Sequence, residues 1–322
     1  MKAIRMHSFG PPEVLQVEDA PSPEPAAKEV RVRAQAVGVN FMDVRMRLGL
    51  RPLDLPTGLG LEAVGVIDAL GQDVRDFQIG DRVGYYLGPP GAYAEQHCAR
   101  ADQLVRIPEP IPADVAVCLL TKAITAQYLL RRTHAVTAGE DVLVHAAAGG
   151  VGLMLAQWAK SLGANVIGAV GSPEKRHAAL ANGCDHVVIT TDADWPQQVR
   201  ALTGAGVDVV YDSVGKDTFE GSVDALKMRG SLVCFGSSSG PLPPVDLASL
   251  GIRGSFKVMF ASGYHFSRDA SEIRDAFADV MAAYQAGAIR PMIHAVLPLA
   301  AAAEAHEALA GRRTVGAIVL RP

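Results

Sequence analysis

A glycine-rich turn near the middle of the chain restricts the fold more than any other feature of the sequence. The apolar run Val142–His145 leads into Ala146–Gly152, which holds only Ala, Gly and Val, and Val151–Leu162 follows with apolar residues at helical spacing. A turn of such small residues lets the backbone approach a pyrophosphate, and the N-terminus of the next helix faces its negative charge. The sequence therefore predicts a strand, a turn and a helix that together bind a dinucleotide.

The match to the dinucleotide fingerprint G-x-G-x-x-G is incomplete. Gly149 and Gly152 fit its second and third glycines, whereas Ala147 stands where the first is expected. A glycine cluster alone can also mark a plain turn. The strand before it, the helix after it and the similar units downstream favour the dinucleotide site.

Short β-branched runs alternate with helical patterns after residue 140, which is typical of βαβ units and a mostly parallel sheet. These segments are Val142–His145, Val151–Leu162, Asn165–Val170, Pro173–Asn182, His186–Ile189, Trp195–Thr203, Val207–Tyr211, Phe219–Leu226, Ser231–Phe235 and Ala270–Gln285, preceded by a helical pattern at Ala113–Arg132. The first part of the chain has short strand patterns at Val30–Gly38, Ala63–Ala69, Gly80–Tyr86 and Ala92–Glu95. We predict an α/β protein whose first part is barrel-like.

The length of the chain indicates two domains. Its 322 residues exceed the roughly 250–300 residues at which a single core stops growing. The tail has short apolar runs and a helical stretch at Ala300–Ala310, so we expect it to return to the first domain. The expected domains are residues 1–121 with 289–322, and residues 122–288.

The choice between NADH and NADPH is made about 20 residues beyond the glycine turn, where NAD sites place an acid on the ribose 2′-hydroxyl. The strand here ends at Ala169–Ser172 without an acid, and Ser172, Lys175 and Arg176 supply a hydroxyl and two cations. A 2′-phosphate is favoured by such groups. The sequence predicts NADPH, with a solvated first helical turn as the alternative role for the two cations.

Charge and cysteine content argue against several classes of protein. A net charge of −4 disfavours nucleic-acid binding, which needs a basic face. The cysteines Cys98, Cys118, Cys184 and Cys234 lack CxxC spacing, so neither disulfides nor structural zinc is expected. The N-terminus lacks a signal-peptide pattern, and no segment approaches the ~18 consecutive apolar residues of a membrane span. We expect a cytoplasmic protein with no membrane partner.

Several motifs in order resemble the quinone oxidoreductase branch of the medium-chain dehydrogenase/reductase superfamily, the branch that includes zeta-crystallin. They are Gly38–Asp43, Gly60–Gly65, Gly80–Val83, His145–Gly152, Tyr211–Gly215 and Phe235–Gly240. The resemblance covers nearly the whole chain. It implies a GroES-like β-barrel catalytic domain made from both chain ends and a doubly wound, parallel-sheet Rossmann domain that binds NADPH.

The resemblance also implies that zinc is not required. Zinc-dependent members of the superfamily carry a ligand His in a Gly-His-Glu motif and a ligand Cys in the first domain. The corresponding motif here is Gly60-Leu61-Glu62, and Asn40 occupies the neighbourhood of the Cys. Without those ligands a tetrahedral catalytic zinc cannot be assembled.

The same resemblance places cofactor contacts on residues from both domains. They are Asn40, Thr125, Tyr128, Gly149, Gly150, Val151, Gly152, Ser172, Lys175, Phe235 and Ser237. The candidate catalytic residues are Asn40, Asp43, Arg45 and Tyr128, with Asn40 and Asp43 at the nicotinamide end. An Asx-type turn after the strand is the alternative role for Asn40 and Asp43.

The expected reaction is hydride transfer from NADPH to a quinone. Arg45 and Arg51 stand where quinone reductases of this branch tend to have tyrosines. This departure leaves room for the first alternative, reduction of the activated C=C bond of an enal or enone. The second alternative is a non-catalytic, crystallin-like NADPH-binding protein. No Ser/His/Asp arrangement and no carboxylate pair is expected in a cleft, so nucleophilic and glycosidase chemistry have no support. The resemblance also implies that Gly251–Val258 is the edge strand that pairs two Rossmann sheets in a homodimer.

Overall fold

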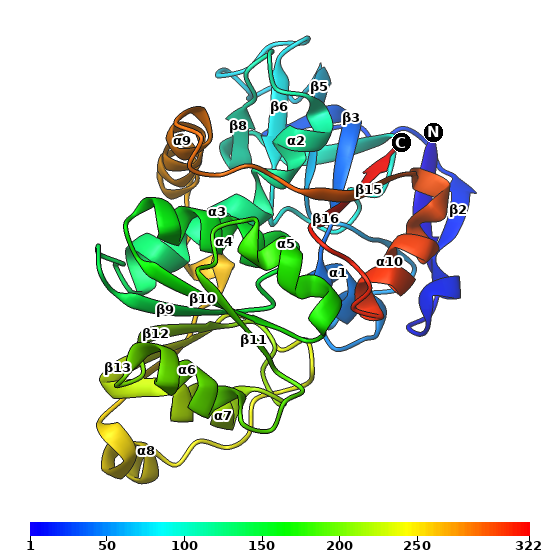
Figure 1. Cartoon of the computed structure of the whole chain (residues 1–322). Coiled ribbons are helices and arrows are strands. Elements are labelled where there is room, and N and C mark those ends of the chain that lie inside the picture. The colour runs from blue at the N-terminus through cyan, green and yellow to red at the C-terminus, as the bar shows by residue number, and fades with distance from the viewer. The chain divides into compact units, whose positions relative to one another are not determined.

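The computed structural model describes the whole chain, Met1–Pro322, and divides it into two compact units (Figure 1). The first unit contains Met1–Thr121, Ser267–Ala278 and Pro291–Pro322. The second unit contains Lys122–Phe266 and Asp279–Arg290. Helix α9 (Ala270–Gln285) is therefore shared between them.

The segment Ser267–Ala278 differs from the expected division, because the sequence placed it with residues 122–288. Its first residue, Ser267, hydrogen-bonds through its hydroxyl to Tyr86, which belongs to the first unit. Ile273 lines the same small hollow as Arg100 and Gln103. These tertiary contacts, which a helical periodicity does not reveal, assign the start of α9 to the first unit.

The second unit is built on a six-stranded parallel sheet with the strand order β11-β10-β9-β12-β13-β14, drawn from green to yellow in Figure 1. Its strands are β9 (Asp141–His145), β10 (Asn165–Val170), β11 (His186–Ile189), β12 (Val207–Asp212), β13 (Leu226–Cys234) and β14 (Lys257–Phe260). Its helices are α3 (Thr121–Tyr128), α4 (Gly150–Ser161), α5 (Arg176–Leu180), α6 (Trp195–Thr203), α7 (Phe219–Ala225) and α8 (Leu247–Gly254).

The order of the parallel strands determines where a ligand can bind. From β9 the chain adds β10 and β11 on one side of the sheet. It then crosses back and adds β12, β13 and β14 on the other side of β9, so the switch point lies between β9 and β12. In open parallel sheets such a switch point leaves a crevice at the carboxyl ends of the two strands. This doubly wound arrangement confirms the predicted Rossmann-type sheet.

The first unit is mainly antiparallel. A seven-stranded sheet runs β15-β16-β3-β5-β6-β8 with β7 paired to β3, and a smaller sheet runs β2-β1-β4. The strands are β1 (Lys2–Met6), β2 (Gln16–Asp19), β3 (Glu29–Val39), β4 (Thr57–Gly58), β5 (Ala63–Leu70), β6 (Arg82–Tyr85), β7 (Gln96–Arg100), β8 (Leu104–Arg106), β15 (Ile293–Pro298) and β16 (Ala317–Arg321). The helices are α1 (Phe41–Arg47), α2 (Ala113–Cys118) and α10 (Ala302–Ala310). Both chain ends contribute to one core, which includes Ile4, Val37 and Leu320.

Two predicted strands are wrong. Ala92–Glu95 contains only an isolated bridge from Ala94 to Ala3, and the next strand begins at Gln96. Residues 251–254 of the expected edge strand are helical, and β14 starts only at Lys257. The helix forms because the Asp246 carboxylate accepts a hydrogen bond from the Ala248 N–H at 2.9 Å and caps it.

One helical segment, Ala113–Thr133, is long and apolar enough to cross a membrane by length and composition alone, with a mean hydropathy of 1.3. Its apolar residues are not consecutive, because Thr121, Lys122 and Gln127 interrupt the run. In the structure 72% of its most apolar window is buried inside the protein. A helix that is apolar on all sides and buried in this way is typical of a protein core.

Candidate functional site

The turn between β9 and α4 has the close backbone packing that a dinucleotide site requires. Ala146 adopts a left-handed conformation with φ of 49°, and the Gly149 N–H donates to its carbonyl at 2.8 Å. A Cβ added to Gly152 would lie 2.1 Å from the same carbonyl oxygen. Only glycine fits there, and the start of α4 consequently lies directly against the end of β9.

The N-terminus of α4 is suited to an anion. Its N-cap is Gly149, which offers no side-chain acceptor, and its first turn contains no acidic residue. The first N–H groups of a helix have no partner within the helix, and they carry its positive dipole end. Gly150 and Val151 are partly exposed. These residues therefore fit the pyrophosphate of a dinucleotide.

The predicted 2′-phosphate residues follow directly after β10. Ser172 is the N-cap of the 3-10 turn Pro173–Lys175, and Lys175 ends that turn; both are partly exposed. Sequence reasoning missed Glu174, whose pKa is lowered chiefly by a hydrogen bond from the Ser172 side chain. Because Glu174 is an exposed surface residue, a bound phosphate can replace it as the partner of the Ser172 hydroxyl.

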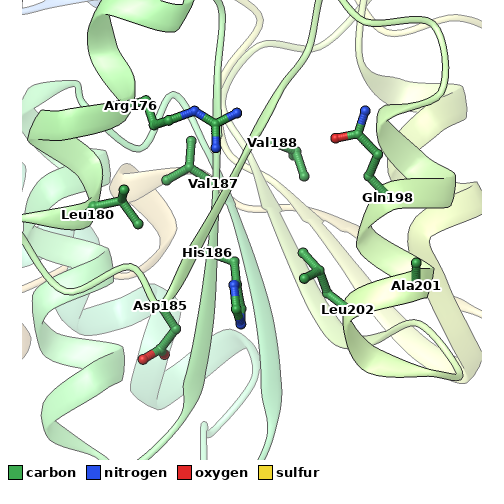
Figure 2. Close-up of a pocket in the computed structure, with 9 residues that line it drawn as sticks. All are labelled: Arg176, Leu180, Asp185, His186, Val187, Val188, Gln198, Ala201 and Leu202. Carbon is green, nitrogen blue, oxygen red and sulfur yellow. The ribbon is translucent and has the colours of Figure 1, made fainter.

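Arg176 follows Lys175 and lines a groove along strand β11 (Figure 2). The groove has a volume of about 570 Å³, and its walls include Leu180 and Leu202. In Figure 2 the Arg176 guanidinium reaches over Val187. The Arg176 side chain therefore lines this groove, and its grouping with Ser172 and Lys175 stays a prediction.

Thr125 and Tyr128 lie on α3, one turn apart. The Tyr128 ring stacks in parallel on Phe266 at 4.7 Å and is 3% exposed. Burial raises the pKa of Tyr128 to about 12, against a smaller opposing effect of a hydrogen bond with Thr125. Tyr128 is therefore a neutral phenol at physiological pH and can act as a hydrogen-bond donor.

Phe235 and Ser237 belong to the loop that follows β13. The Phe235 N–H donates to the Asp212 carbonyl at 2.8 Å. A Cβ on Gly236 would lie 2.7 Å from the Ser213 carbonyl oxygen. The loop is thus packed closely against the residues after β12, at the same edge of the sheet as the glycine turn.

In the first unit, Asn40 and Asp43 open helix α1. The Asp43 carboxylate accepts hydrogen bonds from the Asn40 N–H and the Tyr93 hydroxyl, each at 2.9 Å. Asp43 is fully buried. These contacts account for Asp43 as a helix cap, and a catalytic role for it stays a prediction.

The Asn40 side chain is held by Glu62, a residue to which sequence reasoning gave no role. Asn40 Nδ2 donates to one Glu62 carboxylate oxygen at 2.7 Å, and the Thr121 N–H donates to the other at 2.9 Å. Gly38 is required beside them, since a Cβ there would lie 2.0 Å from Glu62 Oε1. The acid inside the apolar segment Leu61–Val66 was the signal that could have revealed this buried anchor.

Arg45 lies in the last turn of α1, and Arg51 follows just beyond its end. The Leu50 N–H donates to the Arg45 carbonyl and the Gly49 N–H to the Met46 carbonyl, at 2.9 and 3.0 Å. This is the hydrogen-bond pattern of a Schellman motif, and Gly49 has the positive φ, 71°, that it requires. The chain therefore folds back, and the Arg51 guanidinium contacts the Met42 sulfur at 3.6 Å.

The second unit also contains a buried cluster of a serine, a histidine and an aspartate. Ser222 Oγ lies 2.9 Å from His145 Nε2 and donates to Asp212 Oδ2 at 2.9 Å. All three side chains are fully buried. The serine stands between the acid and the histidine, whereas a nucleophilic triad has the histidine in the middle. The cluster is therefore not nucleophilic machinery.

The buried His306 makes the first unit sensitive to acid. His306 Nε2 lies 3.1 Å from the Tyr93 oxygen, whose hydrogen is donated to Asp43. Burial lowers the pKa of His306 to about 3, and the charge of Arg47 adds to this effect. The unfolded histidine, with a pKa of about 6.5, binds a proton that the folded one does not, so stability is lost as the pH falls below that value.

We expect this difference to cost about 2 kcal/mol of unfolding free energy between about pH 7 and pH 5. Urea unfolding at both values checks it. His306→Gln keeps a donor to Tyr93 but does not titrate, so this variant should lose about 2 kcal/mol less than the original protein over the same range. An equal loss in both proteins would contradict the assignment.

Comparison with known proteins identifies the family to which this architecture belongs. Residues 26–109 match the family model of the alcohol dehydrogenase GroES-like domain, and residues 150–281 match that of the zinc-binding dehydrogenases. A quinone oxidoreductase of Pseudomonas aeruginosa is 44% identical over 100% of this chain and 99% of its own. A 2-haloacrylate reductase of a Burkholderia species is 39% identical over 99% of this chain and 98% of its own.

A crystal structure of the Escherichia coli quinone oxidoreductase complexed with NADPH superimposes with a TM-score of 0.97, at 39% identity and covering 100% of both chains. A GroES-like unit joined to a doubly wound Rossmann unit defines a medium-chain dehydrogenase/reductase, and the protein is an oxidoreductase of this class. Within it, the chain belongs to the quinone oxidoreductase family.

Proposed function

We propose that this protein is an NADPH-dependent quinone reductase that works without zinc. The observation that carries the proposal is the uncapped N-terminus of α4 at the switch point of the parallel sheet. The next strand ends without an acid and is followed by the hydroxyl of Ser172 and the cation of Lys175. The quinone oxidoreductases among the relatives, one of them solved with NADPH, support both the cofactor and the acceptor.

In this proposal the residues of the chain mainly bind and orient. Backbone N–H groups of Gly149–Gly152 hold the pyrophosphate, while Ser172 and Lys175 hold the 2′-phosphate. Thr125, Tyr128, Phe235, Ser237 and Asn40 are the remaining cofactor contacts. NADPH supplies the hydride, and the protein supplies its position.

The quinone oxygens need hydrogen-bond donors as negative charge develops on them. The Tyr128 hydroxyl, protonated because burial raises its pKa to about 12, is one such donor. The Asn40 amide is a second, fixed by Glu62 at 2.7 Å, and the Arg45 guanidinium is a third. We propose that these groups polarise the acceptor, whereas Asp43 orders the start of α1 on which Asn40 stands.

A direct assay tests the proposal. Purified protein mixed with NADPH and a simple quinone should consume NADPH, seen as loss of nicotinamide absorbance, and NADH should serve less well. Calorimetry should detect binding of NADPH in the absence of the quinone. Protein that takes up neither nicotinamide coenzyme would refute the proposed function.

Zinc independence is supported by the residues that stand at the ligand positions. Leu61 replaces the histidine of the zinc-dependent motif, and the amide of Asn40 is committed to Glu62. The structure brings together no group of three or more His, Cys, Asp or Glu residues suited to a metal ion. Dialysis against a chelator should leave the activity unchanged, and elemental analysis should find less than stoichiometric zinc.

The remaining assignments follow from the same family. We propose a catalytic domain of residues 1–121 and 289–322, joined in space by Ser267–Ala278, and an NADPH-binding domain made from the rest of residues 122–288. We further propose a soluble, cytoplasmic homodimer without membrane or nucleic-acid partners. Strand β14 supports the dimer, because it is an edge strand with Met259 and Phe260 exposed by 43% and 55%. An exposed apolar edge is a natural place for pairing with a second copy.

A second candidate function is reduction of an activated C=C bond, and the arginines at the end of α1 favour it. Arg45 lies in α1, which begins directly after Asn40, and Arg51 folds back onto Met42 of the same helix after the Schellman turn. Guanidinium groups pair well with carboxylates. The relative named 2-haloacrylate reductase, 39% identical, acts by its name on such a carboxylate.

The arginines should separate the two functions. We expect Arg45→Gln and Arg51→Gln each to raise the KM for a carboxylate-bearing enone or acrylate about 10-fold, because one charge-assisted hydrogen bond contributes roughly 1.5–3 kcal/mol. The KM for a neutral quinone should change less than twofold. Steady-state kinetics with both acceptors checks this, and equal effects on the two acceptors would remove the arginines from acceptor choice.

A further inference from the structure

The buried polar cluster of His145, Ser222, Asp212 and Thr218, here called the switch-point cluster, lies where the sheet reverses. His145 is the last residue of β9, and Asp212 is the last residue of β12. These strands are neighbours, with Tyr211 opposite Val144. Ser222 comes from α7 and bridges the two strand ends. The cluster therefore ties together the two strands between which a Rossmann-type unit binds its ligand.

The hydrogens of the cluster can be assigned by counting. Ser222 has one hydroxyl hydrogen, which it donates to Asp212 Oδ2 at 2.9 Å. The 2.9 Å contact with His145 Nε2 then requires the imidazole to donate, since the serine can only accept there. His145 is thus the Nε2–H tautomer, and its Nδ1 has no hydrogen-bond partner. Burial lowers the pKa of His145, which keeps it neutral.

Asp212 connects the cluster to the loop after β12. One of its oxygens accepts the Val214 and Gly215 N–H groups at 2.7 and 3.0 Å. The other accepts the Thr218 and Ser222 hydroxyls at 2.7 and 2.9 Å. Four donors bind this one buried carboxylate, which restricts the loop to a single arrangement. In any other arrangement a buried donor would lose its hydrogen-bond partner.

The loop after β12 in turn holds the loop after β13. The Ser238 and Ser239 N–H groups donate to the carbonyls of Ser213 and Val214 at 3.2 and 2.8 Å. The Ser239 hydroxyl accepts the Asp217 N–H at 3.0 Å. Phe235 and Ser237, the predicted cofactor contacts, lie in this second loop. The glycine turn begins directly after His145, on the other side of the cluster.

We propose that the switch-point cluster holds the loops after β9, β12 and β13 in one preformed arrangement that NADPH then occupies, so that Ser222, His145, Asp212 and Thr218 are positioning residues for the cofactor. The inference rests on the proposed function, since it takes NADPH as the ligand of the second unit. Its members are buried, and their side chains hydrogen-bond to one another, so we assign them no direct contact with the cofactor. They act through the backbone segments that they anchor.

A matched pair of serines separates positioning from stability. Ser222→Ala removes a buried hydroxyl that contacts His145 at the carboxyl end of the sheet. Ser231→Ala removes another buried hydroxyl, which contacts His134 Nδ1 at 3.2 Å away from the switch point. Both variants should unfold at lower temperature. Only Ser222→Ala should weaken NADPH binding, by about 10-fold, while Ser231→Ala stays within twofold.

Kinetics and spectroscopy sharpen the test. Ser222→Ala should raise the KM for NADPH about 10-fold and leave the KM for the quinone unchanged. Thr218→Val, which keeps the shape of the side chain but removes a donor to Asp212, is the second variant and should act in the same direction. In the original protein, nitrogen chemical shifts of labelled histidine should show His145 as the Nε2–H tautomer, with the signal assigned by its loss in His145→Gln.

The outcomes are distinct. NADPH binding by Ser222→Ala and Thr218→Val as tight as that of the original protein overturns the inference, as does an Nδ1–H tautomer of His145. Equal weakening by Ser222→Ala and Ser231→Ala also overturns it, because general destabilisation then explains the result. An original protein that binds no NADPH refutes instead the proposed function on which the inference rests.

Discussion

Replacing Gly152 with alanine is expected to weaken NADPH binding about 100-fold and to reduce quinone reduction at low NADPH in the same proportion. The added Cβ would lie 2.1 Å from the Ala146 carbonyl oxygen and 2.9 Å from the Ala147 Cα. Both are backbone atoms, so no side chain can rotate away. The N-terminus of α4 must move off the end of β9, and its N–H groups lose their alignment with the pyrophosphate.

Calorimetric titration with NADPH measures this effect directly. Gly251→Ala is the matched control, since Gly251 lies within helix α8 and a Cβ there meets nothing within 4 Å. That variant should bind NADPH as the original protein does and should be slightly more stable, because alanine favours a helix over glycine by roughly 1 kcal/mol. Tight binding by Gly152→Ala would show that the turn does not hold the cofactor.

The second large effect is expected at Lys175. Lys175→Ala should weaken NADPH binding between about 10-fold and 100-fold, since a hydrogen bond to a charged group contributes roughly 1.5–3 kcal/mol. NADH binding should change less than twofold, because NADH has no 2′-phosphate. The preference between the two coenzymes should therefore shrink or disappear.

Lys160→Ala is the control for charge alone. Lys160 lies in the last turn of α4, at the opposite end of the helix from the glycine turn, and pairs with Asp185 at 2.6 Å. The Lys160→Ala substitution removes the same charge from the second unit and should leave the binding of both coenzymes unchanged. If Lys175→Ala keeps the full preference for NADPH, Lys175 is not part of the 2′-phosphate site, and Ser172 must then be tested by itself.

The prediction from sequence was most accurate where the signal is local. Asn165–Val170, His186–Ile189, Trp195–Thr203 and Ala270–Gln285 have the predicted boundaries. Each is a periodic apolar pattern of one element, bounded by turn-forming residues. The family motifs, which are also continuous in sequence, led to the correct superfamily and to the correct pair of folds.

The prediction failed where a distant partner decides the structure. One failure was local, since Gly251–Gly254 looked like strand and is the end of helix α8, whose N-cap is the nearby Asp246. The Asp43 carboxylate binds Tyr93, 50 residues away, a partner that the sequence did not predict. Glu62 had no predicted role, although it fixes Asn40 across 22 residues. Periodicity carries no information about such pairs.

The sequence by itself thus determined the alternation of strands and helices after residue 140, the glycine turn and the absence of an acid at the end of β10. These are consequences of side-chain size, polarity and spacing along one short segment. The tertiary structure alone decided that His145, Ser222 and Asp212 meet, since they are brought together from the ends of β9 and β12 and from α7. A buried hydrogen bond depends on atoms within about 3 Å of each other in space, and the chain brings those atoms together only when the whole sheet has formed.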